Sequence, residues 1–344
     1  MDYKIFIIAE IGCNHNGDFQ LAKTLIEKAK EAGVDAVKFQ TFNASKLISK
    51  FAPKAEYQKI TTGSETSQLE MTKKLELPIE EYIKLKKYAE SLGLIVFSTA
   101  FDMDSVLSLE KQNQVIWKIP SGELTNLPYL QYIADIKIDG KKIILSTGMA
   151  TIAEIHETVK ILKPEENDIT ILHCNTEYPT QDTDVNVSAM IELAKEFPAY
   201  KIGYSDHSVG STAAVMSVAF GGKLVEKHFT LDKTLPGPDH KASATPDELK
   251  ELVDNIRRSE VMYGTERKVV TDSERKNIIV ARKSILAAED IKKGEIFTEE
   301  NLTCKRPGNG ISPMNWFNIL GKVANKNFEK DQLIEAEGFD WEEQ

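Results

Sequence analysis

Cysteines, long apolar runs and signal-like segments are scarce or missing in this chain. Its 344 residues include three cysteines, a small and odd number that argues against a disulfide framework and for a reducing compartment. No apolar stretch approaches the roughly 18 residues needed to span a membrane, and the N-terminus leads straight into a predicted strand. We therefore expect a cytoplasmic protein with no signal peptide and no membrane partner.

Basic excess and nucleotide-binding motifs are also missing. The formal net charge of −10 argues against a nucleic-acid partner, because such binding depends on a basic surface. It does not exclude a small anionic substrate, since a few buried lysines can make one cavity positive. The sequence has neither a Walker loop nor a dinucleotide-binding fingerprint, so no nucleotide is implied.

Eight short apolar runs are present in the first two thirds of the chain, and amphipathic helical segments separate them. Nearly every run ends on residues that can do chemistry, among them Lys38, Lys118, His207 and His228. Alternating strands and helices predict a parallel sheet. Polar residues gathered at the strand ends predict an α/β fold of the (β/α)8 TIM-barrel type, with the active site at that edge.

The length and the change of pattern near residue 280 predict a second domain. A barrel takes roughly 250 residues, so we expect a barrel over residues 1–265, a polar linker over 266–280 and a small β-rich domain over 281–344. The stretch 43–78 has few periodic signals. Because long loops after barrel strands usually cover the active site, its segment 52–58 is a candidate lid, with a surface insertion as the alternative.

Two histidines end neighbouring predicted strands, so both imidazoles can point to one spot. His207 and His228, with water or a carboxylate completing the shell, suit a divalent metal such as Mn²⁺. A single buried histidine would more often be structural. Asp239 follows the last predicted strand and can help to hold the site.

Two lysines end the second and fourth predicted strands. Lys38 and Lys118 could extend to solvent, but hydroxyl groups accompany them at the same edge. Together they predict an anion site, in which the lysines supply charge and the hydroxyls donate to a phosphate and a carboxylate. The hydroxyl residues are Thr99, Ser121, Ser146 and Ser205.

Seven motifs distributed over the whole chain resemble the bacterial sialic acid synthase family. They occupy residues 9–17, 37–42, 118–123, 145–149, 204–208, 226–230 and 305–310. The resemblance implies a TIM barrel followed by a small antifreeze-like (SAF) domain, in a domain-swapped homodimer. It implies condensation of phosphoenolpyruvate with N-acetylmannosamine and water, giving N-acetylneuraminate and phosphate by C–O cleavage. A divalent metal is implied as well, Mn²⁺ first and Mg²⁺ or Co²⁺ as alternatives.

The resemblance also implies roles for individual residues. His207 and His228 become the metal ligands. Lys38 and Lys118 become catalytic residues of a phosphoenolpyruvate cradle completed by Thr99, Ser121, Ser146, Ser205 and, at its rim, Tyr178. Gln40, Glu123 and Asp239 fall near the sugar and the metal, and Arg306 of the small domain reaches the N-acetyl group in the partner's barrel. Glu10 is the candidate that delivers or orients water, and Glu123 the candidate that manages a sugar hydroxyl.

Other functions stay open at this point. The same chemistry on a related sugar would make another nine-carbon acid, such as legionaminic acid. A sugar-phosphate synthase making 3-deoxy-octulosonate phosphate would need a second cationic pocket, and the strand ends carry no extra arginine cluster. A non-catalytic glycan- or ice-binding protein would be expected to lack the histidine pair or the lysines, and both are present.

Overall fold

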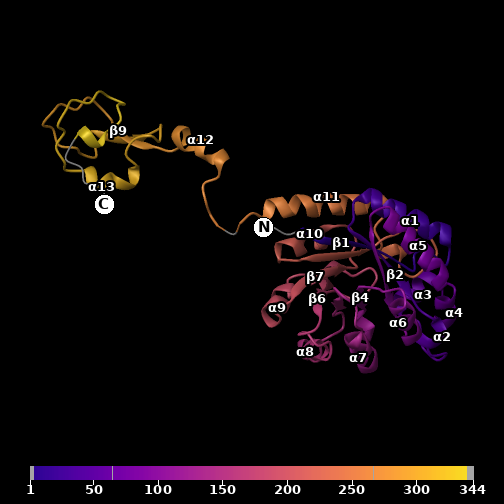
Figure 1. The fold of residues 1–344 in the computed structure, drawn as a ribbon. Helices are drawn as coiled ribbons and strands as arrows, with labels where there is room; N and C mark the ends of the chain where they lie inside the picture. The colour runs from indigo at the N-terminus through magenta and orange to yellow at the C-terminus, as the bar shows by residue number, and fades with distance from the viewer. Residues whose placement is uncertain (1–3, 64, 266, 339–344) are drawn as a thin grey trace. The chain divides into compact units, whose positions relative to one another are not determined.

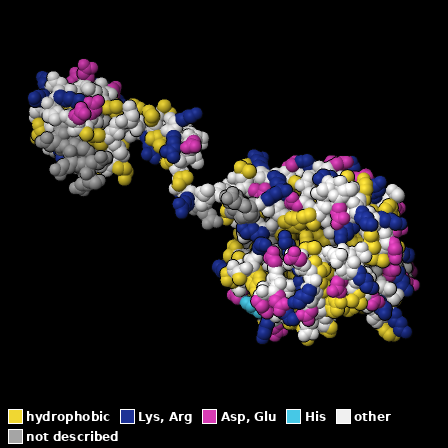
Figure 2. Space-filling model, viewed as in Figure 1, with side chains coloured by type: hydrophobic (Ala, Val, Ile, Leu, Met, Phe, Trp, Pro, Cys, Tyr) yellow, Lys and Arg dark blue, Asp and Glu magenta, His cyan; other side chains and the backbone are white. Residues whose placement is uncertain are grey.

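The structure is a computed structural model that describes residues 4–63, 65–265 and 267–338. It divides into two compact units, Met1–Thr265 and Glu266–Gln344, both drawn in Figure 1. Across the described ranges, no helix combines the length and the apolarity needed to cross a membrane. On the face of the first unit seen in Figure 2, acidic and basic side chains are interspersed.

The first unit is built on eight parallel strands, which confirms the predicted TIM-barrel fold. In hydrogen-bonded order they run β3-β2-β1-β8-β7-β6-β5-β4. Their bounds are β1 (Phe6–Gly12), β2 (Ala36–Thr41), β3 (Ile95–Ala100), β4 (Ile116–Ile119), β5 (Lys142–Ser146), β6 (Asp168–His173), β7 (Lys201–Asp206) and β8 (Leu224–His228).

Strands β3 and β4 stand at the two ends of that order, and a side chain joins them. Gln114, just before β4, accepts a hydrogen bond from the backbone N–H of Ser98 in β3 at 2.8 Å. Its amide donates to the carbonyl of Ser98 at 2.9 Å. The glutamine thus satisfies the backbone groups that a ladder would otherwise pair, and it closes the barrel at this seam.

Amphipathic helices surround the strands (Figure 1). Helix α1 begins after Asp18, whose carboxylate accepts from the N–H groups of Gln20 and Leu21, and it ends at Gly33 in a left-handed conformation. The helices bury their apolar faces against the sheet in one core. They are α1 (Phe19–Ala32), α5 (Ile79–Ser91), α6 (Met103–Glu110), α7 (Leu127–Asp135), α8 (Ile152–Ile161), α9 (Ala189–Glu196), α10 (Thr212–Ala219) and α11 (Pro246–Tyr263), with short 3₁₀ turns η1 (Ser121–Glu123), η2 (Asp182–Asp184) and η3 (His240–Ala242).

The stretch 43–78 forms three short helices instead of an irregular loop. They are α2 (Ala44–Leu47), α3 (Glu56–Thr62) and α4 (Gln68–Lys73). The ammonium of buried Lys54 holds the segment together, donating to the carbonyl of Gly63 at 2.8 Å and to the hydroxyls of Thr62 and Thr66 at 3.1 and 2.9 Å. A network of local bonds, which leaves no periodic trace in the sequence, organises this segment.

Inside the barrel, an apolar layer separates the two ends. Ile8, Ala36, Phe97, Ile144, Leu172 and Leu224 form one buried cluster. Five of these residues stand two positions before a polar residue on the same strand. Each therefore projects into the barrel interior like that polar residue, but farther from the carboxyl end of the strand. Those polar residues are Glu10, Lys38, Thr99, Ser146 and Glu226.

The second unit has a small core and short strands. It has an antiparallel pair, β9 (Ser284–Ala287) and β10 (Leu302–Lys305), followed by the turn η4 (Pro313–Asn315), helix α13 (Trp316–Ile319) and the turn η5 (Ala336–Gly338). Its buried residues include Ile285, Phe297, Ile319 and Phe328. The predicted linker 266–280 contains part of a helix, α12 (Asp272–Ala281), which begins with a capping box formed by Thr271 and Glu274.

Candidate active site

Two lysines and two glutamates meet inside the barrel toward the carboxyl ends of β1, β2, β4 and β8. Glu10, Lys38, Lys118 and Glu226 are between 1% and 4% exposed. The ammonium of Lys38 lies 2.7 Å from a carboxylate oxygen of Glu10 and 3.8 Å from one of Glu226. The ammonium of Lys118 lies 3.1 Å from the other oxygen of Glu226. Four buried charges of balanced sign therefore occupy one site.

The surroundings move the pKa values of the two carboxyl groups in opposite directions. Burial raises the pKa of Glu10 to about 7, although the charge of Lys38 opposes the rise. Burial also acts to raise the pKa of Glu226, but the charges of Lys118 and Lys38 outweigh it and lower that pKa to about 2. At neutral pH Glu226 is an anion, and Glu10 can hold or release a proton.

Hydroxyl groups stand at the same end of the barrel as the lysines, as the sequence predicts. Thr99 accepts a hydrogen bond from Lys38 at 3.1 Å, and Ser205 donates to Glu226 at 3.1 Å. The hydroxyl oxygen of Ser121 accepts from the backbone N–H of Gly148 at 3.0 Å. Ser146 is buried at the end of β5. The structure thus brings donors to the same end of the barrel from β3, β5, β7 and the turn after β4.

The two predicted histidine ligands lie side by side. The ring centroids of His207 and His228 are 5.1 Å apart, and Tyr178 stacks on His207 at 4.1 Å. Burial lowers the pKa of His207 to about 4 and places that of His228 well below its usual value, so both rings are neutral. A hydrogen bond between Nδ1 of His207 and the carbonyl of Asn175 requires the proton on Nδ1, which leaves Nε2 as an unprotonated acceptor, 3.5 Å from the hydroxyl oxygen of Ser205.

A carboxyl group completes this corner of the site. Asp239 lies 3.7 Å from Nδ1 of His228, and it accepts from the thiol of Cys13 at 3.5 Å. Burial raises the pKa of Asp239 to about 6. Nδ1 of His228 has no hydrogen-bond partner. Within the described ranges, no three His, Cys, Asp or Glu side chains are grouped to hold a metal ion, so the two imidazoles would need ligands from substrate or water.

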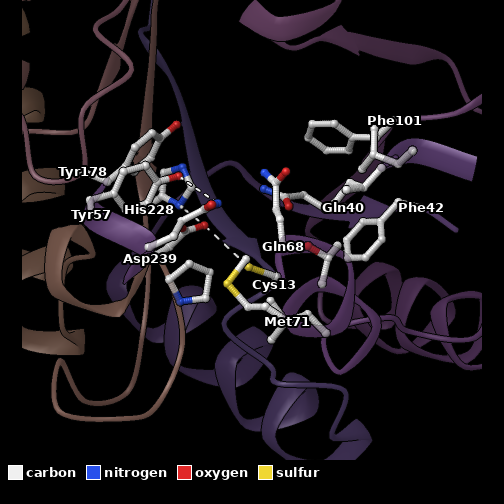
Figure 3. A pocket seen from close by; sticks show the side chains of 16 residues that line it. Cys13, Gln40, Phe42, Tyr57, Gln68, Met71, Phe101, Tyr178, His228 and Asp239 are labelled. Carbon is white, nitrogen blue, oxygen red and sulfur yellow. Dashed lines mark hydrogen bonds and ion pairs between the residues drawn. The ribbon is translucent and has the colours of Figure 1, made fainter. Parts of the chain in front are cut away.

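A pocket of about 230 Å³ opens beside the histidines (Figure 3). In the view of Figure 3, His228, Tyr178, Tyr57 and Asp239 form one wall, and Phe42 and Phe101 face them across Gln40 and Gln68. The segment 43–78 contributes much of the lining. Its residues there are Leu47, Ile48, Tyr57, Gln58, Gln68, Met71, Thr72 and Leu75.

Two further predicted site residues, Glu123 and Arg306, make hydrogen bonds with groups near them in the sequence or in their own unit. Glu123, in η1, is half-buried, and its carboxylate accepts from the side chain of Asn126 at 2.6 Å. Burial raises its pKa. Arg306 belongs to the second unit, where its exposed side chain donates to the carbonyl of Ala281 at 3.1 Å.

Sequence reasoning missed Glu226 as a site residue. The signal was available, because Glu226 and His228 are two residues apart on one strand and therefore face the same side. It also missed the buried pair of Lys227 and Asp206, whose charged atoms lie 2.9 Å apart on the alternate face of β8 and β7. This pair ties together the two strands that carry the histidines.

Known proteins resemble the chain along nearly its full length. It is 50% identical to N,N'-diacetyllegionaminic acid synthase of Campylobacter jejuni over 334 residues, which cover 96% of this chain and 99% of that protein. The identity to N,N'-diacetyllegionaminic acid synthase of Legionella pneumophila is 44% over 327 residues, covering 94% and 91%. The crystal structure of N-acetylneuraminic acid (sialic acid) synthetase from Leptospira borgpetersenii matches with a TM-score of 0.70 and 34% identity, covering 80% of this chain and 90% of that one.

Family models match both units. That of the NeuB family covers residues 25–268, and that of the SAF domain covers residues 282–340. The resemblance inferred from the seven motifs is thereby confirmed, as is the antifreeze-like nature of the small domain. The chain belongs to the NeuB family of nonulosonic acid synthases.

Proposed function

We propose that the enzyme joins phosphoenolpyruvate to an unphosphorylated six-carbon sugar with two acetamido groups, giving a nine-carbon acid of the diacetyllegionaminic type. One observation carries the proposal. The buried cluster of Lys38, Lys118, Glu10 and Glu226 is followed, toward the same end of the barrel, by a pocket with Phe42 and Phe101 on one wall. The cluster suits the anionic substrate, and the pocket suits the sugar.

Phosphoenolpyruvate would occupy the lysine end. Its charges match the ammonium groups of Lys38 and Lys118, and the hydroxyls of Thr99, Ser121, Ser146 and Ser205 can donate to its oxygens. Glu226 lies within ion-pair distance of both lysines and can hold them in place before the substrate binds. Such positioning lowers the barrier to a reaction between two bound substrates.

The sugar would occupy the pocket. Phe42, Met71 and Phe101 offer apolar surface that suits the methyl groups of two acetamido substituents better than a row of hydroxyls. Both legionaminic relatives carry two acetyl groups in the names of their products. This favours the alternative product over N-acetylneuraminate, the first reading of the sequence.

The pocket also favours a sugar without phosphate. Among its described lining residues there is no lysine or arginine, whereas Asp239 contributes a carboxyl group. A phosphorylated sugar would bring two negative charges into this lining without a cationic partner, at a cost in free energy.

The proposed bond changes follow from the substrates. The enol carbon of phosphoenolpyruvate bonds to the aldehyde carbon of the open-chain sugar, whose oxygen takes up a proton. Water adds to the central carbon of phosphoenolpyruvate and loses a proton, for which Glu10 is the candidate acceptor. The C–O bond to phosphate then breaks, so the bridging oxygen leaves with phosphate. The hydroxyl formed from water gives its remaining proton to the departing phosphate, and a ketone remains. Bridge-labelled phosphoenolpyruvate should deliver its label to phosphate.

A divalent metal, Mn²⁺ first, would be held by His207 and His228. The donor set fits, because both imidazoles are neutral and Nδ1 of His228 has no hydrogen-bond partner. When bound, the metal would supply Lewis-acid polarisation of the sugar aldehyde. Tyr178 stacks on His207 and fixes the plane of that ring.

The test is a substrate panel with purified full-length protein. Phosphate release is followed with Mn²⁺, phosphoenolpyruvate and N-acetylmannosamine, its 6-phosphate, or six-carbon sugars with two acetamido groups. We expect the highest kcat/KM with a diacetamido sugar and none with the 6-phosphate. A higher kcat/KM with N-acetylmannosamine would return the assignment to N-acetylneuraminate, and turnover of the phosphate alone would contradict the sugar pocket.

A further inference from the structure

A second cavity lies at the opposite end of the barrel. It has a volume of about 400 Å³ and is lined by residues at or near the beginnings of strands β1, β3, β4, β5, β6, β7 and β8. The catalytic groups stand at the other ends of these strands. Barrel enzymes use the carboxyl ends for catalysis, so this cavity is no part of the active site.

The floor of the cavity is apolar. Phe6, Ile116, Ile144 and Leu224 line it, and Ile144 and Leu224 belong to the buried layer inside the barrel. Side chains normally fill a barrel interior in complete layers. Here the last layer leaves a hollow of the size that small-molecule sites have, about 300 to 1,000 Å³.

The rim of the cavity is cationic. Four lysines and one aspartate belong to its lining: Lys4, Lys142, Lys201, Lys223 and Asp168. Lys201 lies 3.2 Å from Asp168, and Lys4 contacts Asp35 outside the lining. Lys142 is exposed on the first residue of β5, so its ammonium can turn toward the mouth. The lining is thus positive, although the whole chain carries a net charge of −10.

We infer that this cavity binds a free monocarboxylate with an apolar body of about ten carbons. An apolar floor below a positive rim matches an anion whose charge stays at the mouth while its chain is buried. The volume has room for about a dozen heavy atoms, at roughly 30 Å³ for each water-sized group. A cation of the same length would meet the lysines, and a longer chain would not fit.

Decanoate is the probe that tests the site. Isothermal titration of the full-length protein with decanoate below its micellar concentration should give saturable binding of one molecule per chain. Decyltrimethylammonium, which has a chain of the same length and the opposite charge, should not compete. Lack of saturable binding, or equal binding of the cation, would overturn the assignment.

Variants locate the bound decanoate. Lys142→Glu reverses a charge at the rim, and Ile95→Glu adds one at a lining position that is 46% exposed. Each should weaken decanoate binding by at least about tenfold, with circular dichroism unchanged. The matched control is Lys195→Glu, an exposed lysine in the last turn of α9, outside the lining, which should leave the affinity unchanged. Binding that is unaffected by both rim variants, or weakened equally by the control, would exclude this cavity.

Discussion

Glu226 is the residue on which the arrangement of the buried charges depends. Its two oxygens lie 3.1 Å from Lys118 and 3.8 Å from Lys38, and it also accepts from Ser205. Without this carboxylate, two ammonium groups would share a buried site with Glu10 alone. The resulting repulsion between the two ammonium groups would displace them.

Glu226→Gln should therefore lower kcat/KM for phosphoenolpyruvate by about a hundredfold, equivalent to roughly 3 kcal/mol of transition-state stabilisation. The glutamine keeps the shape of the side chain, so circular dichroism should remain native. Phosphate release at several phosphoenolpyruvate concentrations measures the effect. Glu157→Gln, on the exposed face of α8, is the matched control. A loss within threefold of that control would remove Glu226 from the site.

Glu10 should impose a pH dependence on the reaction. Burial raises its pKa to about 7, so the carboxyl group is largely protonated at pH 6 and ionised at pH 8. A proton acceptor works only when ionised, so kcat/KM should rise between these values. Glu10→Gln should lower the activity and remove this rise. A rising limb that persists unchanged in the variant would assign it to another group.

His228 can be tested apart from catalysis. His228→Ala removes one of two neighbouring imidazoles and should weaken Mn²⁺ binding by more than the 10- to 100-fold typical of changes to groups behind metal ligands. Calorimetric titration of the protein with Mn²⁺ measures this directly. His156→Ala, an exposed histidine of α8, is the control. Unchanged Mn²⁺ affinity in the His228 variant would contradict the two-histidine site.

At the scale of the elements, the barrel depends on a side chain at its seam. Gln114 is buried and pairs with both backbone groups of Ser98 where β3 meets β4. Replacing it removes two hydrogen bonds and leaves a buried N–H and a buried carbonyl without partners. The barrel should tolerate this loss less well than the loss of any exposed amide.

Gln114→Ala should accordingly lower the free energy of unfolding by about 2 kcal/mol or more. Chemical denaturation followed by circular dichroism provides the measurement. The control is Gln20→Ala in the first turn of α1, where the side chain is exposed. Equal stability of the two variants would show that other contacts hold the seam.

The strands and their ends could be predicted from the sequence because of how parallel sheets are built. Apolar runs such as 5–8 and 143–145 are followed directly by polar or charged residues. Lys38, Lys118, His207 and His228, which end such runs, could therefore be assigned to the carboxyl edge of the sheet. The structure brings these residues close to the positions expected of them. Their roles stay predictions until the variants are measured.

Other features could not be predicted, since they depend on contacts between distant residues. The link from Gln114 to Ser98 and the sharing of Glu226 by two lysines join separate strands. Lys54 orders 43–78 by local hydrogen bonds without an apolar period. Helix α12 has no buried residue, so its charged sequence lacks the apolar periodicity that predicts a helix and is typical of a linker.

At the scale of the whole molecule, the net charge of the chain does not determine the charge found at the two ends of the barrel. The net charge is −10, yet lysines occupy both ends of the barrel, buried at one end and mostly exposed at the other. An acidic surface need not repel an anionic substrate when local lysines determine the potential inside a cavity. The sequence composition therefore argues against nucleic acid as a partner without deciding the charge of the substrate.

The last prediction concerns how the small domain of one subunit contributes to the active site of another. The resemblance implies a domain-swapped homodimer in which Arg306 reaches the N-acetyl group in the partner's barrel. The residue is exposed on the turn after β10, where a side chain can be presented to another molecule. Arg306→Ala should then raise KM for the acetamido sugar while leaving phosphoenolpyruvate binding nearly unchanged.

Mixing two impaired variants, assayed at a sugar concentration far below the raised KM so that each is nearly inactive alone, tests whether Arg306 acts between subunits. In a heterodimer of Arg306→Ala and Lys118→Ala, a residue acting on the partner's barrel would place both lesions in one site and neither in the other. After random exchange of subunits, about one quarter of the wild-type activity should return, because half of the dimers are mixed and each has one intact site. Each variant incubated alone provides the baseline. If verified heterodimers stay inactive, Arg306 acts on its own barrel or has no part in the site, and the domain-swapped arrangement loses its functional support.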